Sequence, residues 1–181
     1  MYYLITLAVI AVLIVYIFNQ LIRQRSLKDE AWSGIDVQLK RRHDLIPNIV
    51  EAVKGYKSYE QKTLADITQL RSQLMCPVPM KDKGKLENEL STALKSIFAL
   101  AEAYPDLKAN QNFLKLQETL TDIEDQIQLA RRYYNGTVRN YNIAVQTFPN
   151  NFIAQLFLFK PAEFFELEYV TERKVPDVKF V

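Results

Sequence analysis

The chain has 181 residues, of which 24% are charged and 49% hydrophobic, so an intrinsically disordered chain is excluded and one domain plus an anchor is expected. The net charge of +2 excludes a strongly basic nucleic-acid binder, and only 4 glycines disfavour a strand-rich fold with many tight turns. One cysteine and one histidine offer no zinc-binding spacing, so neither a metal nor another cofactor is expected.

The first expected element is a membrane-spanning helix over residues 1–22, which carry no charged side chain. A helix of this length spans about 33 Å, close to the roughly 30 Å of a bilayer core. The residues expected in the membrane include Tyr2, Leu4, Ile10, Leu13 and Phe18. A cleaved signal peptide is the alternative, but no Lys or Arg precedes the apolar run and no small-residue cleavage site follows it.

Positive charges immediately after the apolar run predict the orientation of the anchor. Arg23, Arg25 and Lys28 lie on its C-terminal side, whereas the other side has only the α-amino group. Because positive flanks stay in the cytoplasm, the N-terminus is expected outside and the helical domain inside. The expected location is therefore the cell membrane, with a single pass.

Residues 23–149 are expected to form an antiparallel four-helix bundle, because apolar residues recur at spacings of three and four. The first helix is expected to be kinked at Pro47 and to end at Gly55. Its heptad-like stripe, which resembles that of a coiled coil, consists of Trp32, Ile35, Leu39, Arg42, Ile46, Ile49, Val53 and Tyr56.

The second helix is expected to open with a capping box at Ser58 and Gln61 and to run to Leu74. The segment 76–79, together with Gly84, is expected to break the chain before the third helix. Short connections of this kind favour helices that pack next to one another in sequence order.

The third helix is expected from Leu86 to Tyr104, and a long fourth helix from Pro105 to Phe148. Proline suits the first turn of a helix, and Pro149 is expected to end the last one. An even number of helices returns the chain toward the bilayer.

Residues 150–181 form an aromatic-rich C-terminal tail, for which two placements are open. The tail either covers the open base of the bundle, which is the favoured interpretation, or lies against the membrane surface. Its aromatic residues include Phe152, Phe157, Phe159, Phe164 and Phe165.

Several polar residues lie on or beside the apolar stripes and predict a buried polar network. Arg42 falls within the first stripe, and a buried charge needs a partner. If the first and fourth helices are antiparallel, Arg42 meets Glu124. The predicted network contains Asp36, Arg42, Asp44, Glu124, Arg131 and Asn135. It is interpreted first as a structural network that fixes helix register and second as a catalytic or ligand site.

Several segments of the chain, spread over nearly its whole length, resemble the motifs of the LemA family. The similar segments are 31–33, 35–42, 44–48, 102–110, 130–131, 134–135, 141–142 and 148–149, together with Glu60, Arg71 and Glu124. The resemblance implies a short outside N-terminus, one membrane helix and a helical bundle, with no agreed active site. A related branch organises internal membranes in magnetotactic bacteria, which suggests a scaffold role.

The function expected from these patterns is a membrane-anchored scaffold or protein-interaction module without catalytic residues. Its expected partners are the lipid bilayer and a protein of unknown identity, with a homo-oligomer as an open alternative and no nucleic acid. The rival hypothesis is a hydrolase-type enzyme with a polar site near Arg42 and Glu124. A transmembrane sensor is a third, weaker alternative.

Overall fold

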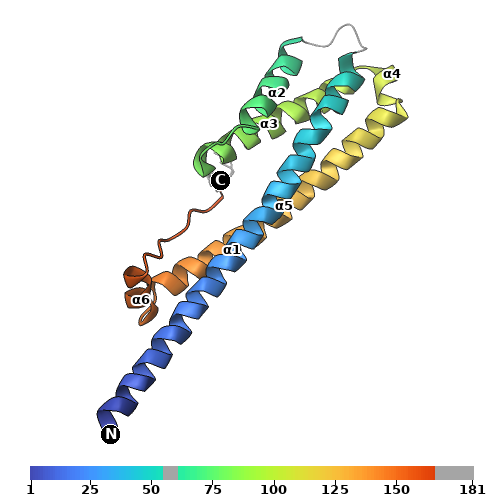
Figure 1. Cartoon of the computed structure of the whole chain (residues 1–181). Coiled ribbons are helices and arrows are strands. Elements are labelled where there is room, and N and C mark those ends of the chain that lie inside the picture. Colours follow the sequence, from blue (N-terminus) through green and yellow to red (C-terminus); the bar gives the residue numbers. More distant parts are fainter. Residues whose placement is uncertain (55–60, 166–181) are drawn as a thin grey trace, which may run out of the picture. The chain divides into compact units, whose positions relative to one another are not determined.

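The computed structural model describes residues 1–54 and 61–165, and every regular element within these ranges is a helix (Figure 1). The all-helical class predicted from the sequence is therefore confirmed. The helices are α1 (Tyr2–Lys54), α2 (Gln61–Leu74), α3 (Met80–Ala101), α4 (Pro105–Lys108), α5 (Gln111–Gln146) and α6 (Asn150–Leu156).

The chain divides into two compact units, each built from separate stretches of sequence. Unit 1 comprises Met1–Asp44 and Leu120–Phe164, and unit 2 comprises Leu45–Thr119 and Phe165–Val181. Helices α1 and α5 contribute residues to both units.

Helix α1 contains both the predicted anchor and the first predicted amphipathic helix. No break separates residues 1–22 from the heptad-like stripe, and α1 continues through Pro47 to Lys54, one residue before Gly55. A proline removes one hydrogen bond from a helix, a loss that α1 tolerates at this position. Gly55, predicted to end this helix, and Ser58, predicted to form a capping box with Gln61, lie outside the described residues.

The prediction that Gly84 interrupts the chain is wrong. Helix α3 begins at Met80, and its ladder opens with a 2.9 Å hydrogen bond from the Lys83 N–H to the Pro79 carbonyl. Gly84 is buried within this helix. A helical glycine costs only about 1 kcal/mol relative to alanine, which packing can offset.

The long fourth helix predicted from Pro105 is divided into α4 and α5. Pro105 does occupy the first turn of a helix, as expected, but α4 ends at Lys108. The Asn110 side chain then accepts hydrogen bonds from the backbone N–H groups of Asn112 (2.9 Å) and Phe113 (3.3 Å). An asparagine in this role caps a new helix, so the chain restarts at Gln111.

The C-terminal end of α5 also differs from the prediction. Helix α5 ends at Gln146 rather than Phe148, because a residue before proline is disfavoured in the helical conformation. A cis Phe148–Pro149 peptide bond follows, and the short helix α6 forms within the predicted tail.

Unit 1 is held together by contacts between α1 and the second half of α5. Arg42 contacts Glu124, the Trp32 ring lies 5.4 Å from the Tyr134 ring, and Lys28 lies over the Tyr141 ring. The partner's number in α5 therefore rises as the residue number in α1 falls. Figure 1 shows these segments side by side, with α6 against the earlier part of α1.

Unit 2 has its own apolar core, in which α2 lies next to α3. The Phe98 ring lies 5.3 Å from the Phe113 ring, which joins α3 to the start of α5. Buried residues of this unit include Ile49, Val53, Ile67, Leu90, Leu94, Ile97, Leu107 and Phe113.

Candidate functional site

The apolar N-terminal part of α1 is the first candidate functional feature. Among the described residues, α1 is the one helix that is long and apolar enough to cross a membrane, judged by length and composition. Of the predicted spanning residues, Tyr2, Leu4, Ile10 and Leu13 are exposed. Apolar side chains that are exposed along a whole helix are typical of contact with lipid rather than with water.

The predicted orientation signal is exposed at the end of the apolar stretch. Arg23 and Arg25 are exposed, and Arg25 forms a long ion pair with Asp29. Lys28 is half-buried. Its Nζ lies 2.9 Å from an Asp29 carboxylate oxygen and 5.6 Å from the centre of the Tyr141 ring. The cationic flank is thus partly neutralised within the protein itself.

Arg42 and Glu124, two members of the predicted polar network, are brought together in the structure. The Arg42 side chain is only 2% exposed, and its Nη1 donates a 2.7 Å hydrogen bond to the Glu124 Oε1, whose side chain is 25% exposed. Breaking a buried pair of this kind leaves a desolvated charge, which is strongly destabilising. The pair therefore holds α1 against α5 within unit 1.

The other predicted members do not all lie in the interior. Asp36 and Asp44 are exposed, so the predicted burial is wrong for both, because neither shares the helical phase of Ile35, Leu39 and Ile46. Arg131 and Asn135 are half-buried on α5. Within residues 1–54 and 61–165, no group of three or more His, Cys, Asp or Glu side chains is placed to hold a metal ion.

Three α5 side chains that were not predicted to bind the tail hold its backbone. Asn142 makes two hydrogen bonds with Ala162, donating to its carbonyl at 2.9 Å and accepting from its N–H at 2.8 Å. The Tyr141 hydroxyl donates to the Lys160 carbonyl at 3.0 Å, and the Tyr134 hydroxyl donates to the Glu163 carbonyl at 3.1 Å. We call Tyr134, Tyr141 and Asn142 the tail clamp.

The two phenols of the tail clamp are shifted by their surroundings. Burial raises the pKa of Tyr134 above its ordinary value, and the nearby carboxylates of Asp29 and Glu163 raise it further. Burial also raises the pKa of Tyr141, with Arg25 opposing and Asp29 reinforcing the shift. Both hydroxyls therefore remain protonated donors well above neutral pH.

The residues just before the segment held by the tail clamp pack against the predicted anchor. Ile17 and Leu21 of α1 share a buried cluster with Tyr141, Val145, Ile153, Ala154 and Phe159. The Phe18 ring lies 4.8 Å from the Phe157 ring and 5.9 Å from the Phe159 ring. The last turns of the predicted spanning segment therefore have protein on one side.

Comparisons with known proteins agree with the resemblance read from the motifs. A model described as "LemA family" matches residues 31–180. The chain is 31% identical over 138 residues to Protein LemA of Metamycoplasma hominis, covering 76% of this chain and 63% of that protein. The names of these relatives state no enzymatic activity.

More distant relatives carry a different name. The chain is 23% identical over 160 residues to Magnetosome protein MamQ 2 of Paramagnetospirillum magneticum, covering 74% of this chain and 59% of that protein. The sequence identity of the chain to Magnetosome protein MamQ of Magnetospirillum gryphiswaldense is also 23%. This chain spans about three fifths of the length of the curated relatives that it matches. The family match and the 31% identity together show that this chain belongs to the LemA family.

Proposed function

We propose that this LemA-family chain is a single-pass membrane protein that presents a helical scaffold at the cytoplasmic face of the cell membrane. The observation that carries the proposal is the mostly exposed apolar N-terminal part of α1, which continues without a break into the part of the helix that packs on α5. A continuous helix transmits its orientation, so the anchor would fix how the helical body stands on the bilayer.

The orientation is supported by Arg23, Arg25 and Lys28 at the end of the apolar stretch. A positive flank favours the cytoplasmic side, which places the helical body inside the cell and the N-terminus outside. Residues 1–22 then form the anchor, residues 23–149 the body and residues 150–181 the tail.

We infer that the body is an antiparallel four-helix bundle. Within unit 1, the residue contacts between α1 and α5 run in opposite order along the two helices. Within unit 2, α2 follows α1 after a short stretch of sequence and lies next to α3. Short connections of this kind favour antiparallel neighbours.

The proposed partners are the bilayer and another protein, either a different chain or a second copy of this one. The LemA family match and the relatives named magnetosome proteins support a membrane-associated helical protein rather than a nucleic-acid binder. The Arg42–Glu124 pair is best explained as a structural contact, and no observation supports the hydrolase hypothesis.

Photo-crosslinking in native membranes tests the interaction role. Unit 1 has exposed apolar side chains on its body at Val37, Leu129 and Tyr133. With a photo-reactive phenylalanine analogue at each position, we expect at least one to give a discrete adduct, with the partner identified by mass spectrometry. The same analogue at the exposed polar residues Glu30 and Asp125 is the control.

An adduct of twice the 21.1 kDa chain mass would identify a homo-oligomer, and another mass would identify a different protein. If all three apolar positions give no more adduct than the two controls, the interaction role is contradicted.

A further inference from the structure

The turn from α5 through α6 exposes large apolar side chains that no described part of the protein covers. Phe148 is 75% exposed, Phe152 63%, Leu156 71% and Leu158 80%. The Phe148 and Phe152 rings lie 5.9 Å apart, so at least these two form one surface. We call these four residues the apolar tip. Contiguous exposed apolar surface usually marks contact with a protein or a membrane.

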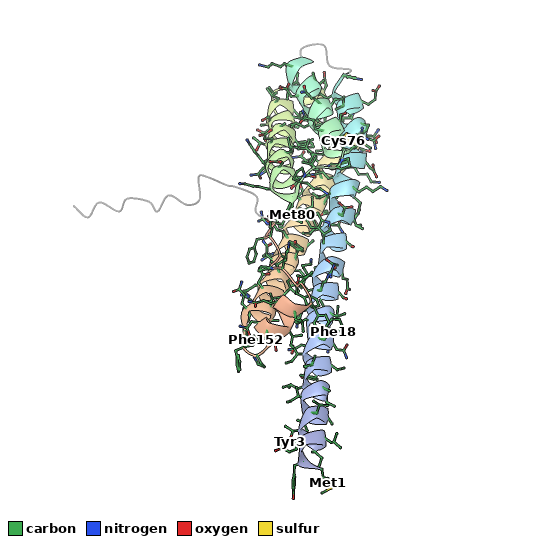
Figure 2. All side chains as sticks on the ribbon, turned by 60° about the vertical axis from the view of Figure 1, so that its left-hand side comes forward. Met1, Tyr3, Phe18, Cys76, Met80 and Phe152 are labelled. Carbon is green, nitrogen blue, oxygen red and sulfur yellow. The ribbon has the colours of Figure 1, made fainter. Side chains whose placement is uncertain are left out.

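The position of the apolar tip along α1 points to the membrane. Helix α6 packs on Ile17 and Leu21, with Ile14 and Phe18 against the same cluster. These residues belong to the uncharged stretch that ends at Ile22. At 1.5 Å per residue, Ile14 lies about 12 Å before Ile22 along the helix axis. Figure 2 shows Phe18 and Phe152 at a similar level along α1, farther from the N-terminal end of the helix than Tyr3.

If α1 crosses the bilayer, its hydrocarbon boundary falls near the first charged residues, Arg23 and Arg25. Helix α6 then lies within the outermost 12 Å or so of the membrane on that side. Interfacial helices bury their apolar face about 5–10 Å into the boundary between headgroups and acyl chains, a depth that matches this position. At the same level, Val15 and Tyr16 of α1 are also exposed.

The charge pattern of the C-terminal segments agrees with this level. No charged side chain occurs between Arg139 on α5 and Lys160 after α6, and both of these flanking cations are exposed. Because α6 packs on Ile17 and Leu21, the uncharged part of α1 and the uncharged turn lie side by side, and cations border each of them. Exposed cations at such a border can contact lipid phosphates.

The backbone at Leu158 adds an independent observation. Its φ angle is 58°, a left-handed conformation that glycine or asparagine adopts far more readily than leucine. The strained residue holds a leucine side chain that is mostly exposed, so the protein interior gains little from it. Immersion of that side chain in lipid accounts for a leucine at this position.

We propose that the apolar tip inserts into the cytoplasmic leaflet beside α1, so that the protein holds the bilayer through a spanning helix and a shallow wedge. The occupant of this surface is lipid. The inference rests on the proposed membrane-spanning role of α1 and adds a second membrane-binding site to it. Two attachment points restrict the tilt of the helical body, which a single helix would leave free.

Site-directed spin labelling of the full-length chain tests the proposal. Cys76 is exposed and is replaced by serine, and single cysteines are then introduced as Phe152→Cys, Leu156→Cys, Ile10→Cys and Gln126→Cys. All four positions are exposed, so labelling leaves the packing intact. The protein is reconstituted into vesicles of phosphatidylcholine and phosphatidylglycerol, and nitroxide collisions with oxygen and with a water-soluble nickel chelate are compared.

The ratio of oxygen to nickel accessibility is expected to be several-fold higher at positions 152 and 156 than at position 126, and highest at position 10. If positions 152 and 156 match position 126 while position 10 remains in lipid, the wedge is contradicted and the anchor stands. If position 10 is also aqueous, the anchor itself is contradicted. Shielding of 152 and 156 from both reagents would show a protein partner and overturn the lipid assignment.

Matched charge variants provide a second readout. Phe152→Glu and Leu156→Glu change exposed residues, and with a label at position 148 they are expected to raise nickel accessibility several-fold. Gln126→Glu, on an exposed face of α5, is the control and is expected to leave that label unchanged. An unchanged label in all three variants would contradict the wedge.

Discussion

Arg42 and Glu124 form a largely buried ion pair between α1 and α5 within unit 1. The arginine is almost fully enclosed, and its hydrogen bond to Glu124 is 2.7 Å long. The pair could be predicted from the sequence because Arg42 falls in the phase of an apolar stripe and must find an acid. Asp36 and Asp44, which were expected in the same network, lie at exposed positions of α1.

Replacing Glu124 tests the energetic role of this pair. Glu124→Ala leaves the Arg42 guanidinium buried without its carboxylate, and we expect a loss of about 3 kcal/mol in unfolding free energy. This is the low end of the usual range because Glu124 is itself a quarter exposed. Glu124→Gln retains an acceptor and should cost about 1–2 kcal/mol. Urea unfolding in detergent micelles, followed by the fluorescence of Trp32, gives both values.

The matched control is Asp125→Asn, which changes an exposed acid at the neighbouring position of α5 and should alter stability by less than about 0.5 kcal/mol. A stability of Glu124→Ala equal to that of this control would contradict the structural role of the pair.

Tyr134 links the interior of unit 1 to the tail. We expect its replacement by phenylalanine to change how the unfolding free energy depends on pH. Loss of its hydrogen bond to Glu163 should cost about 1 kcal/mol at neutral pH. The folded protein raises the pKa of Tyr134, so its contribution is complete below about pH 10 and is lost as pH rises through the folded pKa. Tyr134→Phe should therefore lose less stability than the parent chain above pH 10.

Unfolding free energies are measured from about pH 8 to about pH 11, a range that includes the ordinary pKa of a phenol. Tyr133→Phe, at an exposed neighbouring position, should follow the parent chain. Identical pH dependence in Tyr134→Phe and Tyr133→Phe would show that the buried phenol does not contribute.

The tail clamp could not be predicted from side-chain patterns, because its partners are backbone groups far away in sequence. Tyr134, Tyr141 and Asn142 lie in segments that resemble family motifs, but their hydroxyl and amide groups bind the carbonyl and N–H groups of residues 160–163. A backbone partner has no residue type, so composition and periodicity carry no signal for it.

At the scale of elements, Asn142 tests how the tail is attached to α5. Asn142→Ala removes both hydrogen bonds to Ala162, and local opening of the tail should become easier by about 1–2 kcal/mol. Cleavage after the exposed Glu163 by a glutamate-specific protease should therefore accelerate roughly tenfold. The appearance of a new C-terminus at Glu163 is followed by mass spectrometry.

Asn140→Ala provides the control, since Asn140 is exposed on the same helix. Equal cleavage rates in Asn142→Ala and Asn140→Ala would contradict the role of the tail clamp.

The existence of the helices was more predictable than their ends. Apolar spacing identified the helical segments, and Pro105 was correctly associated with the start of a helix. The division between α4 and α5 depends on the Asn110 cap, and Gly84 is retained in α3 by its burial. Helix α6 depends on tertiary packing against Ile17 and Leu21, which no local pattern contains.

At the scale of the whole molecule, the proposed function depends on one property of α1. Its apolar and amphipathic parts belong to a single helix, so a membrane anchor and a packed helical body share one continuous backbone. The sequence predicts the apolar part because the uncharged stretch before Arg23 is both long enough and apolar enough to cross a bilayer. The sequence did not show that protein covers one side of its last turns.

The most direct test of the proposed function is whether α1 crosses the membrane. In a Cys76→Ser chain, a single cysteine is placed either in a Gly-Ser-Cys-Ser-Gly insertion after Met1 or at Ser33, which lies on α1, and is treated with a membrane-impermeant thiol reagent in intact cells and in permeabilised cells. We expect labelling of the inserted cysteine in intact cells and of position 33 only after permeabilisation. Labelling of both positions, or of neither, in intact cells, followed by labelling of both after permeabilisation, would place them on one side and contradict the membrane-spanning helix.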